Sequence, residues 1–411
     1  MNQGASRECR IICSTGAVFD NNDLKTVWEL EDSIWAQTTH GVSYTFPELG
    51  QSIYKDDEKE LQKTIICQDL IWSKDGTSLV TIHNDYGIRQ YLIPEEEETE
   101  AWENDDVKQL IPFTRFFKNQ SMVSSKVHPY YSLYNDDPKH NTVLLASRDV
   151  PLQLYSVDNS HQGPICNYET MDSNTERYET AYSIDYMTEK EFLVGFMKNR
   201  INLYNVNRRN PVWSIQPATS KSKISAKAIV SCFDEVNFNG DGYYSRCRLA
   251  GTYKNEIYRI DTRVSPSQDL VYQGDQTHNS GLIQILNSLN GNYVYLIKRN
   301  SITIDVLDRR LNFQRVNQLP LPFNMGNHKF KASLSSQLGL IMGTNAGYLI
   351  QWDNDTVEFG GVPRQARTSI TAETGCRISF PQRDTHRVAA SPDGMSVAVA
   401  HENGLSIARL G

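Results

Sequence analysis

The sequence predicts an all-β fold in which seven similar sheets stand side by side and close into a ring. Three observations lead to this prediction: a short strand-like segment recurs seven times, a turn rich in Asn, Asp or Gly precedes each copy, and a second strand-like segment lies upstream of most of these turns. Of the 411 residues, 39% are hydrophobic, which is enough apolar material for a sizeable core.

The recurring segment alternates apolar and polar residues, which is typical of a strand with one buried face. Successive copies end 45 to 64 residues apart. The end positions are Tyr91, Tyr155, Tyr204, Ile260, Leu307, Trp352 and Ala408. We therefore expect one sheet, or blade, for each copy.

The turns before the copies are expected to be tight hairpins, because Asn, Asp and Gly accept positive φ and hydrogen-bond to the neighbouring backbone. Asp85 and Asp149 lie in two of these turns, and we interpret them as structural residues that order the hairpin. His83 and His401 immediately precede two of the turns. We expect each of these histidines to bond within its blade rather than to act in catalysis.

The unit of turn, strand, hairpin and strand is typical of a WD-type blade, which normally ends in Trp-Asp. Only Trp352-Asp353 retains the whole dipeptide, so the repeats are degenerate, and we interpret these two residues as structural. Seven copies predict a seven-bladed WD-type β-propeller with degenerate repeats over residues 64–411.

A single blade cannot cover its apolar faces alone, so the blades must stack and the ring must close. The sequence ends at Gly411, directly after the last strand-like segment, and the last blade therefore lacks an outer strand. We expect residues within 1–66 to supply that strand, which would pair the two ends of the chain. Residues 1–63 are accordingly assigned to an N-terminal extension.

The net charge of −8 is unevenly distributed along the chain. Residues 1–106 carry 8 basic and 22 acidic side chains, whereas residues 107–411 carry 33 basic and 27 acidic ones. Much of the acid lies in residues 95–106, which we expect to form a solvated loop. A mildly basic body permits contact with RNA or a ribonucleoprotein without requiring it.

Several function classes find no support in the sequence. No apolar run is long enough to span a membrane, and the N-terminus lacks the layout of a signal peptide, so an intracellular protein is expected. The seven cysteines are scattered without a CxxC pair, which favours reduced thiols over disulfides or zinc. Phosphate-binding, hydrolase, metalloprotease and dinucleotide motifs are absent, so we expect no catalytic residue, metal or cofactor.

Basic residues beside the predicted hairpins are the candidate contacts for RNA or a partner protein. Cations on the loops of a propeller face would contact phosphates. The candidates are Lys221, Lys223 and Lys227 in one loop, and the pairs Arg208-Arg209, Lys298-Arg299 and Arg309-Arg310. For each pair taken singly, ordinary solvated charge is the simpler interpretation.

Long stretches of the sequence resemble one protein family. The strongest are residues 65–76 and 83–96, and further matching stretches are residues 110–124, 151–156, 178–183, 229–233, 292–300 and 357–363. They are similar to the fungal nuclear splicing-associated WD-repeat family whose name abbreviates "synthetic with trimethylguanosine synthase". The order of the blades resembles, more distantly, the telomerase Cajal body WD-repeat protein, which binds small nuclear RNAs.

The resemblance covers about residues 64–411 and implies a non-enzymatic nuclear scaffold in pre-mRNA splicing. Its implied partners are small nuclear ribonucleoproteins and other splicing proteins, with RNA contact direct or indirect, and it would help to stabilise the 5′ splice-site complex. We expect a monomer without membrane contact. The alternative is a chaperone or trafficking factor that binds small nuclear RNA directly. An enzyme with a site in the central channel would need a cluster of carboxylates, histidines or a metal, which the sequence does not offer.

Overall fold

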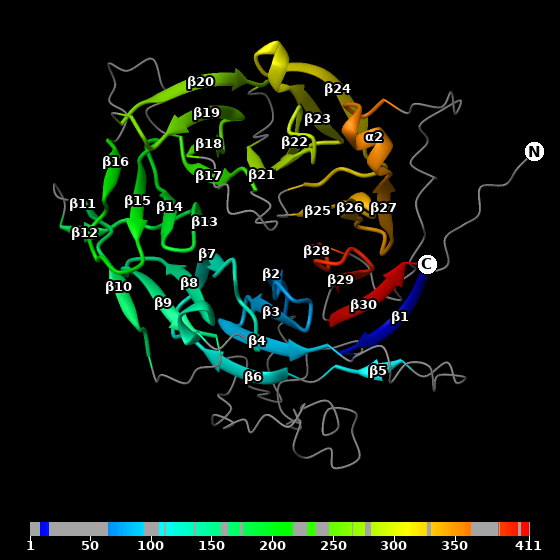
Figure 1. Cartoon of the computed structure of the whole chain (residues 1–411), viewed down its shortest axis with the longest axis horizontal. Coiled ribbons are helices and arrows are strands. Elements are labelled where there is room, and N and C mark those ends of the chain that lie inside the picture. Colours follow the sequence, from blue (N-terminus) through cyan, green and yellow to red (C-terminus); the bar gives the residue numbers. More distant parts are fainter. Residues whose placement is uncertain are drawn as a thin grey trace, which may run out of the picture.

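Seven blades surround a central channel in the computed structural model of the chain (Figure 1). The prediction of a seven-bladed β-propeller is confirmed, and almost all regular structure is strand. The structure describes residues 9–15, 65–93, 107–110, 112–134, 137–157, 163–172, 176–216, 228–235, 246–264, 266–275, 281–326, 330–362, 385, 387–401 and 404–410.

Five blades are four-stranded antiparallel sheets, with the first strand at the channel and the last at the rim (Figure 1). Blade 1 contains β2 (Cys67–Trp72), β3 (Ser78–His83), β4 (Gly87–Leu92) and β6 (Pro112–Phe117); blade 2 contains β7 (Met122–Val127), β8 (Thr142–Ser147), β9 (Leu152–Ser156) and β10 (Cys166–Tyr168). Blade 3 contains β13 (Ser183–Tyr186), β14 (Glu191–Gly195), β15 (Ile201–Asn205) and β16 (Trp213–Ile215). Blade 4 contains β17 (Val230–Phe233), β18 (Cys247–Thr252), β19 (Glu256–Asp261) and β20 (Gln268–Gln273); blade 5 contains β21 (Leu282–Asn287), β22 (Tyr293–Lys298), β23 (Thr303–Asp308) and β24 (Gln314–Pro320).

The last two blades depart from this plan. Blade 6 has three strands, β25 (Ala332–Ser335), β26 (Gly339–Gly343) and β27 (Leu349–Trp352), followed by the short helix α2 (Asn354–Glu358). Blade 7 has five, because β28 (Arg387–Ala390), β29 (Ser396–His401) and β30 (Gly404–Leu410) are joined by β1 (Cys9–Ser14) and β5 (Lys108–Gln109). A separate pair, β11 (Met171–Asp172) and β12 (Arg177–Tyr178), lies between blades 2 and 3 in the chain.

The hairpin between β3 and β4 shows how an acidic residue orders the turn. Asp85 is buried and accepts a hydrogen bond from Gly87 N at 3.0 Å, while its two oxygens accept from the Arg89 guanidinium at 2.6 and 3.1 Å. In the equivalent turn of blade 2, Asp149 has a φ of 59°, the left-handed conformation that Asp and Asn tolerate better than most residues. Local side chains therefore set the position of these turns.

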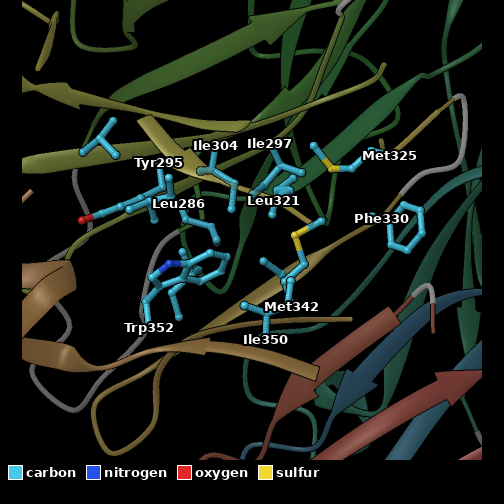
Figure 2. Close-up of a cluster of buried hydrophobic side chains, with 14 of the residues drawn as sticks. Leu286, Tyr295, Ile297, Ile304, Leu321, Met325, Phe330, Met342, Ile350 and Trp352 are labelled. Atoms are coloured by element: carbon cyan, nitrogen blue, oxygen red, sulfur yellow. The ribbon is translucent and has the colours of Figure 1, made fainter. Parts of the chain in front are cut away.

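Trp352 is the last residue of β27, and Asp353 is the N-cap of α2. The indole is buried between blades 5 and 6, in the same cluster as Tyr295 and Ile350 (Figure 2). Asp353 Oδ1 accepts a hydrogen bond from Thr356 N at 2.7 Å and so caps the helix. Because the chain turns into α2 directly after β27, the expected fourth strand of this blade is not found among the described residues.

Apolar contacts between neighbouring blades form the core. Figure 2 shows the cluster between blades 5 and 6, where Ile297 and Ile304 of one blade lie near Met342 and Ile350 of the other. Comparable buried clusters lie at each of the six remaining interfaces between adjacent blades. Each blade therefore stabilises both of its neighbours, as expected for stacked repeats.

The strand β1 closes the ring. It pairs antiparallel with β30, with Ile11 opposite Ala408 and Ser14 opposite Ser406, and β5 pairs with its other edge in parallel. The side chain of Cys13 is fully buried in the cluster that joins blades 7 and 1. The expected pairing of the two chain ends is present. The boundary at residue 63 stays a prediction, because residues 16–64 lie outside the described residues, as does the acidic run 95–106.

The two histidines before the hairpins bond within their own blades. His83 Nε2 lies 2.7 Å from Thr81 Oγ1, and His401 Nε2 lies 3.3 Å from Ser406 Oγ. Burial lowers the pKa of His401 to about 4 and that of His83 well below its usual value. Both rings are therefore neutral at physiological pH.

We predict that Cys13→Asp opens the ring, because it places a carboxylate at a fully buried position of the closing strand. The free energy of unfolding should fall by about 3 kcal/mol or more. Arg10→Asp, on an exposed position of the same strand, should cost less than about 1 kcal/mol. Urea denaturation of both variants measures the difference, and equal stabilities would argue against a closing role for β1.

We predict that acid destabilises the protein between pH 7 and 5 partly through His401. The unfolded ring takes up its proton near the ordinary pKa of about 6.5, whereas the folded ring does so only at about 4. Stability is therefore full above pH 6.5 and falls as the pH falls towards 4, with a loss of about 2 kcal/mol at pH 5 from this residue. His401→Gln should flatten the profile of Tm against pH; an unchanged slope would contradict the assignment.

Candidate functional site

The innermost strands of the seven blades line a cavity of about 590 Å³ along the axis of the ring. Its walls come from β2, β7, β13, β17, β21, β25 and β28, the strands nearest the centre in Figure 1. Charged and amide side chains project from these strands among the apolar ones. We call the hydrogen-bonded set that joins the blades around this cavity the channel belt; its side chains are Asp69, Trp72, Ser125, Lys126, Asp185, Asp234, Glu235, Arg248, Gln284, Asn287 and Lys331.

Asp69 of β2 connects three blades. Its Oδ1 accepts from Lys331 Nζ at 2.7 Å and its Oδ2 from Ser125 Oγ at 3.0 Å, so blade 1 is bonded to blades 6 and 2. Burial would raise the pKa of this carboxyl, but Lys331 and Arg387 outweigh it and hold the pKa below its usual value. Asp69 is therefore ionised at neutral pH.

Arg248 of β18 is the most deeply buried charge of the belt. Its Nη2 donates to Asp185 of blade 3, and its Nε donates to Asp234 Oδ1 at 2.8 Å. Lys126 of blade 2 lies 2.7 Å from the other oxygen of Asp185, and Asn287 of blade 5 donates to Asp234 at 3.1 Å. Although burial opposes ionisation of Asp185, Lys126 and Arg248 lower the pKa of that carboxyl. Blades 2 to 5 are linked in this way.

Gln284 and Trp72 complete the belt. The Gln284 amide donates to Glu235 Oε1 at 2.7 Å and exchanges two hydrogen bonds of 2.9 Å with the backbone of Ala332, which links blades 4, 5 and 6. Trp72 Nε1 donates to Ala389 O at 2.9 Å, which links blades 1 and 7. Every blade thus takes part in a side-chain link at the channel.

Two cysteines line the described part of the channel, and neither is activated as a nucleophile. Burial raises the pKa of Cys67 and of Cys232 to about 12, so both thiols stay protonated and unreactive. Within the described residues, no group of three or more His, Cys, Asp or Glu is placed to hold a metal ion. No described helix is long and apolar enough to cross a bilayer.

The candidate cations from the sequence lie on two opposite faces of the ring. Strands alternate in direction within a blade, so the hairpins between second and third strands share one face, and the turns between third and fourth strands share the other. We call these the hairpin face and the turn face. Lys298-Arg299 lies on the hairpin face, whereas Arg208-Arg209 and Arg309-Arg310 lie on the turn face. Lys221, Lys223 and Lys227 lie outside the described residues.

Several of these cations form ion pairs or hydrogen bonds within the protein. Lys298 is buried, with Nζ 2.6 Å from Asp305, and Arg309 Nη2 donates to Asn287 Oδ1 at 2.6 Å. Arg310 is held by Asp308 at 2.6 Å and also donates to Tyr293 Oη.

The remaining described candidates, Arg208, Arg209 and Arg299, form no ion pair with the described residues. Arg208 and Arg209 are exposed, and the Arg299 guanidinium lies 4.1 Å from the centre of the Tyr253 ring. The candidate cations that the structure describes are therefore not gathered into one ring.

The residues of the channel belt are not among the candidates predicted from the sequence, because the predicted cations all lie in or beside hairpins and loops. A usable signal was present, since Asp69, Lys126 and Asp185 are charged residues inside short strands that also contain large apolar side chains. A charged residue inside a buried strand requires a partner, and for a residue of an innermost strand that partner can lie across the channel or in a neighbouring blade.

The fold and the channel define a class of protein: a closed β-propeller whose blades are joined by an ion-paired belt. Sequence comparison is more specific. The chain belongs to the SWT21 family, which is the family that the resemblance indicated. It is 40% identical to Protein SWT21 of Kluyveromyces lactis over 390 residues, which cover 93% of this chain and 91% of that protein.

Two other SWT21 proteins also match the chain over most of its length. Protein SWT21 of Zygosaccharomyces rouxii is 41% identical over 86% of this chain and 81% of its own length. Protein SWT21 of Vanderwaltozyma polyspora is 36% identical over 97% of both chains. No family model matches the sequence.

We predict that Arg248→Met costs about 3–5 kcal/mol of unfolding free energy, because it leaves Asp185 and Asp234 buried without the guanidinium between them. The matched control is Arg263→Met in the same blade, where the ion pair with Asp261 is largely exposed and should be worth less than about 1 kcal/mol. Chemical denaturation of both variants measures the difference. Similar losses would show that the belt does not stabilise the ring.

Proposed function

We propose that this protein is a non-catalytic nuclear scaffold in pre-mRNA splicing. It associates with small nuclear ribonucleoproteins and other splicing proteins, and helps to stabilise the 5′ splice-site complex. It acts as a monomer without a cofactor. The observation that carries the proposal is family membership, since the chain matches SWT21 proteins over nearly its whole length. The family name, which abbreviates "synthetic with trimethylguanosine synthase", supports a role in RNA processing.

The architecture supports a scaffold for a physical reason. A ring that is closed by β1 and joined by the channel belt holds its described hairpins and turns in fixed relative positions. Loops held in this way can present two faces to different partners at once, which raises the effective concentration of one partner near another without any chemical step. The protonated thiols and paired carboxylates of the channel are consistent with this role.

We predict that the affinity-tagged full chain, purified from yeast nuclei, recovers spliceosomal small nuclear RNAs well above an untagged control. Sequencing of the bound RNA measures this. A parallel sample treated with ribonuclease before washing should retain splicing proteins, because a scaffold is held by protein contacts as well as by RNA. Recovery of neither these RNAs nor splicing proteins above background would refute the proposal.

A further inference from the structure

The hairpins of blades 3, 4 and 5 differ from their neighbours in charge. The connecting residues 196–200, 253–255 and 299–302 contain four basic side chains and no Asp or Glu. The hairpins of blades 1 and 2, by contrast, contain Asp85 and Asp149. The hairpins themselves are therefore positive in three consecutive blades.

These three hairpins adjoin one another. Ile229, at the start of blade 4, forms a bridge with Met197 of the blade 3 hairpin, and its carbonyl accepts from Tyr253 N of the blade 4 hairpin at 3.0 Å. Gly281, at the start of blade 5, packs so closely on the Tyr253 backbone that a Cβ there would lie 2.7 Å from it. Its carbonyl also accepts from Arg299 N at 2.9 Å. The three tips therefore form one continuous surface.

Three cations of this surface are available to a partner. Lys198 and Lys254 are exposed at the tips of their hairpins, and neither forms a salt bridge within 4.0 Å with the described residues, although the Glu179 carboxylate also attracts Lys198. Arg200 is not counted among the available cations, because its Nε lies 3.1 Å from Glu179 Oε2 and the two charges neutralise each other. Arg299 has no carboxylate partner among the described residues.

An aromatic side chain holds Arg299 in place. Its Nη2 donates to Tyr253 Oη at 2.9 Å, and its guanidinium carbon lies 4.1 Å from the centre of the Tyr253 ring. Tyr253 and Tyr182 both line the end of the channel on this side. Planar rings and a guanidinium stacked on a ring are groups on which nucleic-acid bases stack.

We propose that Lys198, Lys254 and Arg299, with Tyr182 and Tyr253, bind single-stranded RNA; we call this set the basic hairpin surface. The two exposed amines contact phosphates, and the Tyr and Arg planes stack with unpaired bases. A single strand fits better than a duplex, because only its bases are free to stack on side chains. The inference rests on the proposed role in splicing and names the part of the protein that would touch RNA.

The test is binding of the full chain to a fluorescently labelled single-stranded RNA of about 20 nucleotides, followed by anisotropy over a range of salt concentrations. Lys198→Glu with Lys254→Glu should weaken binding about tenfold or more at low salt. The slope of log affinity against log salt should fall by about 1.4, because each lost phosphate contact removes about 0.7 on a single strand. Arg299→Lys, which keeps the charge but loses the plane, should weaken binding with little change in slope.

The matched control is Arg208→Glu with Arg209→Glu, which makes the same change of charge at exposed positions of the turn face. It should leave the affinity within about twofold, and equal losses from the two faces would overturn the assignment. A duplex of the same length should bind more weakly than the single strand; equal binding would also overturn it. Unchanged Tm values show that the variants fold.

The two proposals can fail separately. If the wild-type chain does not bind naked single-stranded RNA but still recovers small nuclear RNAs from nuclei, the basic hairpin surface is refuted and the scaffold stands. If it binds RNA through this surface but recovers no splicing component from nuclei, the scaffold is refuted and the surface stands.

Discussion

The pairing of β1 with β30 is the contact on which the rest of the ring depends. A stacked repeat is stable only when both of its apolar faces are covered, and an open arc leaves one face bare at each end. Here the seventh blade takes strands from both ends of the chain, and Cys13 fills the cluster that covers blade 1. The channel, the belt and the two loop faces all require this closure, because each is built from residues of several blades.

Two kinds of contact hold the ring together: apolar clusters between the blades and the hydrogen bonds and ion pairs of the channel belt. Apolar clusters between blades supply most of the stabilising free energy, since burial of side chains such as Tyr295 and Trp352 removes large areas from water. The channel belt makes the arrangement of the blades specific, because a buried charge such as Arg248 finds both of its carboxylate partners in only one relative position of the neighbouring blades. The belt therefore restrains the relative positions of blades that apolar packing alone would leave freer to adjust.

Features encoded locally were predictable from the sequence, and features that need distant partners were less so. The hairpins follow from Asp85, Asp149 and similar residues, because an Asx side chain acts within its own turn. The count of blades follows from the repeat. Closure by the N-terminal region was expected from the missing outer strand, but β5 was not, since two residues with no repeat signal can be recognised as a strand only beside β1.

The remaining differences have the same origin. After β27 the described chain continues into α2, which Asp353 caps, and not into the outer strand expected for blade 6; the Trp-Asp dipeptide alone does not distinguish these outcomes. Sequence spacing likewise could not say that Lys298 pairs with Asp305 while Lys198 is exposed, because one lies in strand β22 and the other at a hairpin tip, and this depends on where each strand ends.

The fifth strand of blade 7 gives the seam of the ring an unusual topology. In the chain, β5 falls between β4 and β6, which are neighbours in blade 1, so the polypeptide leaves that blade, crosses to the adjoining one and returns. Both ends of the crossing are anchored, with Ile93 N bonded to Thr77 O and Leu110 N bonded to Ser14 O. Separating the first and last blades therefore requires β5 to detach from β1, or β1 and β5 together to detach from β30, in addition to the loss of the apolar contacts between the two blades.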